Sequence, residues 1–150
     1  MGYYTTLTGY DVRWKEGTDE AQVLQHVKET MFTDEALLKH AGGGSWPIKE
    51  GAPVASYKWY SWTDTEACRN AETIGFILNQ FFDDVTIDEA GDWWPEFDSK
   101  KGQEDHLMEV LAPFIDAGCY MEWRGEDGYL YRWEFDGERM TEKSGEVVWA

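Results

Sequence analysis

The sequence predicts an α+β fold, an antiparallel sheet with a C-terminal β-meander and about four helices packed on one face. Hydrophobic residues recur at strand spacing near both ends of the chain and at helical spacing in several segments between them. Asp127-Gly128 and Asp136-Gly137 fall where two-residue hairpin turns belong. No repeat, linker or low-complexity tract divides the 150 residues, so residues 1–150 are expected to form a single domain.

The first part of the chain predicts strands and short helices that are marked by local signals. In chain order, the expected elements are a strand over residues 3–14, helices over 18–31 and 33–40, a loop over 41–53 and a strand over 54–62. Gly9 lies inside the first strand and marks a bulge or a close approach. Thr18 and Thr33 are each placed to cap a helix, and the glycines after Ala41 end the second one.

The second part of the chain predicts two helices and a group of short strands. In chain order, these elements are a long helix from Thr63 to about Phe81, a strand over 85–87, a loop over 88–99, a helix over 103–117 and strands over 119–124, 129–135, 138–142 and 146–149. Thr63 to Glu66 form a capping-box pattern. Pro113 is expected to bend the last helix or to end it early.

The two cysteines, Cys68 and Cys119, each lie within an apolar pattern and are expected to be free, buried thiols in a reducing cytoplasm. Their spacing leaves a single disulfide open as the alternative. No signal peptide and no membrane-spanning stretch is visible, so the expected location is cytoplasmic.

The charge of the chain is concentrated in one segment. Thirteen acidic residues and two lysines lie between Asn70 and Trp123, which gives −11 of the total formal charge of −17. Such a segment repels phosphate backbones and anionic membranes, so direct binding of nucleic acid or of a membrane is not expected. The partner that the charge favours is the basic surface of another protein, in the host cell if a phage encodes this chain.

The candidate binding residues lie in the acidic, tryptophan-rich stretch after the long helix. They are Asp83, Asp84, Asp88, Glu89, Asp92, Trp94, Glu96 and Asp98. Carboxylates on a rigid frame can mimic the phosphates of DNA and occupy a nucleic-acid groove, and an exposed tryptophan among them would anchor the interface. The alternatives are a solvated acidic loop and a calcium-binding cluster, although the calcium-loop pattern of an EF-hand is absent.

No catalytic motif accompanies this stretch, so no catalytic residue and no cofactor is predicted. The three histidines lack zinc-binding spacing, and no serine stands in a nucleophile motif. Acidic neighbours are expected to raise the pKa of Cys68, which makes it a poor nucleophile. The glycines before Ser45 lack the lysine of a phosphate-binding loop.

Both ends of the chain carry residues that resemble a known group. These are Met1 to Gly9 at the start and, towards the end, Gly125 to Gly128, Tyr131 to Trp133, Asp136-Gly137 and Val147 to Trp149. They are similar to small uncharacterised proteins of actinobacteria and their phages. The resemblance implies a phage-derived cytosolic protein, and by analogy an inhibitor of host machinery or of host defences.

Four functions remain open from the sequence. The first is a non-enzymatic inhibitor that docks its acidic residues on a basic groove of a nucleic-acid-handling or defence protein. The others are a toxin-immunity protein, a metal-dependent enzyme that uses the carboxylates, and an accessory phage protein. Exposed aromatic residues also allow a homodimer through the edge of the meander.

Overall fold

The computed structural model describes residues 4–36, 63–100 and 104–146. Within these residues the predicted α+β fold is confirmed. A five-stranded antiparallel sheet has the order β4-β1-β5-β6-β7, and β2 and β3 form a second, two-stranded sheet. The predicted loop over 41–53 and strand over 54–62 lie outside the described residues, as do the second half of the 33–40 helix and most of the 146–149 strand.

Before the final meander, helices follow the first strand, a group of short strands comes next, and α5 and a 3-10 turn come last. The strands are β1 (Thr5–Asp11), β2 (Asp84–Ile87), β3 (Trp93–Glu96), β4 (Asp98–Ser99), β5 (Tyr120–Gly125), β6 (Leu130–Phe135) and β7 (Met140–Gly145). The helices are α1 (Glu20–Met31), α3 (Thr65–Arg69), α4 (Ile74–Phe81), α5 (Glu104–Leu111) and the 3-10 helix η2 (Ala112–Phe114).

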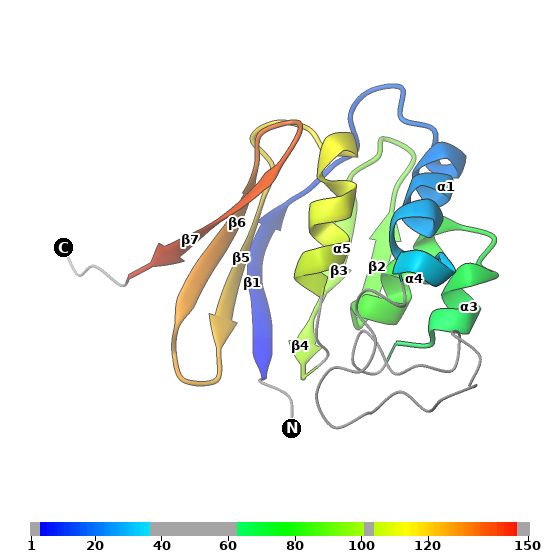
Figure 1. The fold of residues 1–150 in the computed structure, drawn as a ribbon. Helices are drawn as coiled ribbons and strands as arrows, with labels where there is room; N and C mark the ends of the chain where they lie inside the picture. The colour runs from blue at the N-terminus through cyan, green and yellow to red at the C-terminus, as the bar shows by residue number, and fades with distance from the viewer. Residues whose placement is uncertain (1–3, 37–62, 101–103, 147–150) are drawn as a thin grey trace, which may run out of the picture.

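The larger sheet has one buried and one open face. Trp123, Trp133 and Phe135 point inward and are buried, while Tyr120 and Glu122 alternate with them and are only half-buried. Figure 1 shows α5 beside β1 and in front of β3, with α1 and α4 to its right. The period of two along the strands therefore separates the core from the outward face.

The C-terminal meander turns at the predicted places, but the two-residue turns predicted there are wrong, because residues 126–129 and 136–139 form the connections. Gly128 and Gly137 both have positive φ, at +84° and +95°, a conformation that glycine adopts without strain. They close the β5–β6 and β6–β7 hairpins. The third strand of the meander, β7, covers Met140–Gly145 and not residues 138–142, so it both begins and ends later than predicted.

The two sheets are joined by backbone hydrogen bonds to β1. The Trp93 N–H donates to the Val12 carbonyl at 2.9 Å, and the Leu7 N–H donates to the Phe97 carbonyl at 2.8 Å. Consequently β3 and β4 run along β1 as nearly one strand, which Figure 1 shows in green beside the blue strand. The register of β1 against β5 shifts between Leu7 and Gly9, which confirms the irregularity expected at that glycine.

Three predicted helix boundaries are wrong. Asp19, and not Thr18, caps α1, because its carboxylate accepts the Ala21 N–H at 2.9 Å. The long helix predicted from Thr63 is two helices: Asp64 caps α3, and Thr73 starts α4 by accepting the Phe76 N–H. A second capping residue inside an apolar pattern thus ends one helix and opens another.

The helix predicted over residues 103–117 ends early, as its proline indicates. α5 stops at Leu111, and Pro113 lies within the short 3-10 turn that follows. Proline lacks the N–H that a continuing helix requires, so the chain leaves the helix there and turns towards β5.

The loop predicted over residues 88–99 is also wrong, since most of it is β3 and β4. Trp93, Pro95 and Phe97 are buried and their neighbours are not, which is the alternation of a strand covered on one side. Pro95 is tolerated because Val85, which lies opposite it, turns its backbone N–H and carbonyl away from β3 towards Asn79, so the missing N–H of the proline breaks no hydrogen bond between β2 and β3.

Candidate functional site

The β2–β3 hairpin, which carries most of the predicted binding residues, is anchored along both edges. On one side β3 and β4 are hydrogen-bonded to β1 and its extension. On the other side the Asn79 side chain of α4 donates to the Val85 carbonyl at 3.1 Å and accepts the Val85 N–H at 3.0 Å. This amide satisfies the backbone of an edge strand, so the hairpin presents its side chains from a fixed frame.

The eight predicted residues lie together on this hairpin and at its two ends. All are exposed except Asp92, which is half-buried. Asp84 belongs to β2, Trp94 and Glu96 to β3, and Asp98 to β4. Thr86 also belongs to this group, but sequence reasoning missed it because it is uncharged. We call the eight residues together with Thr86 the acidic surface.

Two cross-strand pairs define the outward face of the hairpin. Asp84 lies opposite Glu96, and Thr86 lies opposite Trp94. Like charges in directly opposed positions destabilise a strand pair. Within the described residues no cation forms an ion pair with either Asp84 or Glu96. The hairpin therefore holds an unfavourable charge pair beside an exposed indole.

Trp94 is fixed in place although it is exposed. Its side chain is 57% exposed, and its indole N–H donates to the Asp88 carboxylate at 3.3 Å. The other oxygen of Asp88 accepts the backbone N–H groups of Ala90 and Asp92 in the turn. The hydrogen bond from the Asp92 backbone, followed by that from the Trp94 indole, holds the pKa of Asp88 below its usual value. Asp88 thus stays ionised and orients the tryptophan.

Asp83 and Asp98 also have structural roles. One Asp83 oxygen accepts the Asp98 backbone N–H at 2.6 Å, which ties β4 to the end of α4. The Asp98 carboxylate in turn accepts the Thr6 hydroxyl at 2.9 Å. By contrast, the side chains of Asp84, Glu89 and Glu96 form no hydrogen bond or ion pair with other described residues. Among the exposed members of the acidic surface, these three carboxylates can change without loss of a described side-chain contact.

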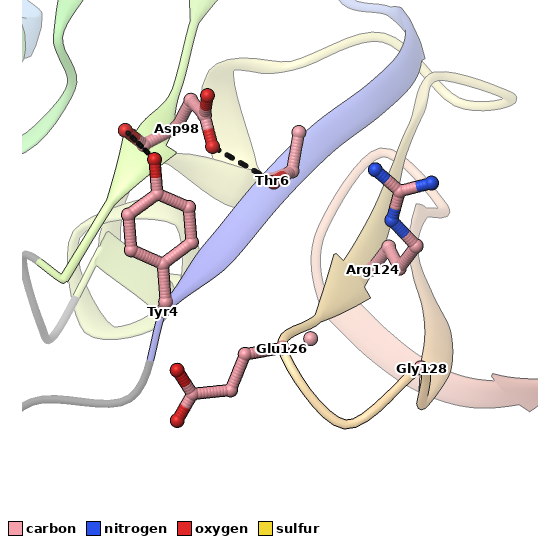
Figure 2. Close-up of a pocket in the computed structure, with 7 residues that line it drawn as sticks. Tyr4, Thr6, Asp98, Arg124, Glu126 and Gly128 are labelled. Atoms are coloured by element: carbon pink, nitrogen blue, oxygen red, sulfur yellow. Dashed lines mark hydrogen bonds between the residues drawn. The ribbon is translucent and has the colours of Figure 1, made fainter.

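A shallow polar hollow of about 430 Å³ opens next to Asp98, between β1 and the β5–β6 turn. Figure 2 shows Tyr4 and Thr6 bonded to Asp98 on one side of it and Arg124 on the other. Glu126 and the glycines of the turn complete the lining. The hollow borders the acidic surface, and Arg124 brings a positive charge to that border.

Other reactive groups lie away from this surface. Cys68 and Cys119 are free and buried, as predicted, and burial followed by the charge of Asp64 raises the pKa of Cys68 to about 12. In the part of the chain that the structure describes, no three His, Cys, Asp or Glu side chains are placed to hold a metal ion. None of the described helices has the length and apolar character that crossing a bilayer requires.

Comparison of this chain with models of known protein families, with curated proteins and with solved structures finds no match.

Proposed function

We propose that this chain is a non-enzymatic binding protein that docks its acidic surface on a basic groove of another protein. The proposed target is a nucleic-acid-handling or defence protein of a host cell, and the chain itself would be phage-derived. The observation that carries the proposal is the grouping of seven carboxylates and an exposed tryptophan on one anchored hairpin. No lysine or arginine occurs from Asn70 to Ser99 to reduce that charge.

Electrostatics supports a protein partner of opposite charge. A fixed negative field steers a basic surface towards it and repels nucleic acid. A basic groove that normally holds phosphates is a surface of that kind, so the carboxylates can occupy it in place of a nucleic acid.

The state of Trp94 supports its use as the anchor of the interface. A large aromatic side chain that becomes buried on binding contributes much of the affinity at protein interfaces. Burying an indole normally leaves an N–H group that needs a new partner. Here Asp88 already accepts that N–H, so a partner can cover the ring without leaving a polar group unsatisfied.

The proposal is tested with a charge-reversed variant that spares the structural carboxylates. The variant carries Asp84→Lys, Glu89→Lys and Glu96→Lys, at the exposed positions that make no described contact. The matched control carries Glu35→Lys, Glu138→Lys and Glu146→Lys, three exposed acids away from the hairpin in sequence. Both variants have the same net charge, so a difference between them reports the position of the charges and not their sum.

The readout is a pull-down from host lysate at low and at high salt, analysed by mass spectrometry. We expect the wild type and the control to retain a basic nucleic-acid-handling protein at low salt and to release it when the Debye length falls to about 3 Å. The charge-reversed variant should not retain it. Equal capture by both variants, or no specific partner for the wild type, contradicts the proposal.

A further inference from the structure

The geometry of the acidic surface favours a guanidinium group over an ammonium group as the cation that binds there. Trp94, Glu96 and Asp98 alternate with buried residues and are exposed on the same side. Two residues along a strand span about 7 Å, so the Cα atoms of Trp94 and Glu96 lie about that far apart along β3. Asp84, opposite Glu96, places a second carboxylate beside it.

A guanidinium group matches this arrangement better than an ammonium group does. It is planar, stacks on an aromatic face and carries N–H donors along its edge that pair with carboxylates. A guanidinium lying on Trp94 can direct its edge towards Glu96 and Asp84. An ammonium group is a compact point charge that is strongly hydrated, and it cannot satisfy the ring and both carboxylates in this way.

The electrostatics of the indole add to this preference. Asp88 holds an ionised carboxylate at the edge of the Trp94 ring, so a cation above the ring is attracted by that charge as well as by the ring itself. A cation between Asp84 and Glu96 also relieves their mutual repulsion. The ring and the opposed carboxylates thus provide two different reasons for a cation to settle at one place.

We infer that the acidic surface recognises an arginine side chain of its protein partner, which stacks on Trp94 and pairs with Glu96 and Asp84. The inference rests on the proposed function and narrows it, because it names the group that the surface selects. The partner is therefore a protein whose basic groove presents arginine at its centre, and a groove lined only by lysine is a poor partner.

The test uses two peptides of equal length and charge, one of alternating glycine and arginine and the other of alternating glycine and lysine. Calorimetric titration of the native protein at low salt measures both affinities. We expect the arginine peptide to bind about two- to fivefold more tightly for a single exposed cation–π contact. Trp94→Leu should remove this preference, while Phe76→Leu, which alters another exposed aromatic residue on α4, should retain it.

The possible outcomes distinguish a failure of the arginine inference from a failure of the proposed function. Equal affinities that both disappear in the Asp84, Glu89 and Glu96 charge-reversed variant overturn the arginine preference and leave an acidic binding surface. An arginine preference that persists in Trp94→Leu also overturns the inference, because the selection then occurs elsewhere. If neither peptide binds at low salt, the arginine inference fails, and the pull-down then decides whether the acidic surface binds any partner.

Discussion

Glu104 is expected to make the stability of this protein fall as the pH rises. It stands at the start of α5 with its side chain 7% exposed, and no described group bonds its Oε2 atom. Burial raises its pKa from the usual 4.5 to about 7. The folded chain therefore keeps this proton over a pH range in which the unfolded chain has released it. The contribution of Glu104 to the free energy of unfolding is therefore fully present below pH 4.5, and it is lost as the pH rises towards 7.

The size of the effect follows from the two pKa values. Each pKa unit corresponds to about 1.4 kcal/mol, so complete ionisation costs about 3 kcal/mol, most of which falls between roughly pH 5 and roughly pH 8. Glu104→Gln preserves the shape of the side chain and removes the titration. We expect the wild type to lose about 2–3 kcal/mol more free energy of unfolding over that range than this variant does.

The assay is urea denaturation followed by tryptophan fluorescence at both pH values, with linear extrapolation to water. Asp105→Asn, at the exposed neighbouring position, is the control and should keep most of the wild-type dependence on pH. Parallel dependences for the wild type and Glu104→Gln refute the argument, because they mean that the buried carboxyl does not bind the proton more tightly in the folded chain.

Three further predictions concern the core, a helix cap and a thiol. Leu78 is fully buried in α4, so Leu78→Ala should lower the free energy of unfolding, measured by chemical denaturation, by about 2–5 kcal/mol. A change below about 1 kcal/mol would show that the surrounding side chains collapse into the cavity. Thr73→Ala removes the α4 cap and should cost about 1 kcal/mol, seen as a lower Tm in a thermal melt, whereas Thr30→Ala at an exposed position should leave the Tm nearly unchanged. The Cys68 thiol, with a pKa of about 12, should resist an aromatic disulfide reagent at neutral pH until urea unfolds the chain, and rapid labelling of the native protein would speak against its burial.

The features that the sequence predicts correctly are those with a local physical cause. Asp127-Gly128 and Asp136-Gly137 supply the positive φ that hairpin turns need, so the meander could be placed from sequence alone. Pro113 ended its helix because it lacks an N–H. The exact caps were harder to predict, since Thr18 and Asp19 are adjacent and both can cap a helix; only the backbone geometry selects Asp19.

The conformation of the candidate site could not be predicted, because it depends on contacts distant in sequence. Acidic residues and Pro95 favour a loop when only neighbours are considered. The hairpin forms because β1 and the residue after it supply backbone partners on one side, and Asn79 supplies partners for the backbone of Val85 on the other. The sequence predicted the residues of the acidic surface, but it could not separate Asp83, Asp88 and Asp98, which hold the hairpin together, from the carboxylates that only face outward.

The place of β1 in the sheet constrains how the chain is made. Thr5 pairs with Ser99 on one side and with Gly125 on the other. The first strand of the chain can therefore pair only after residues that are synthesised much later have become available. Such a high contact order slows folding, because the loops must close before their contacts stabilise them. While the ribosome has not yet released β5, the backbone of β1 on the nascent chain lacks its strand partners and is open to aggregation. A product truncated before residue 120 lacks the whole meander, so it cannot close the sheet around β1.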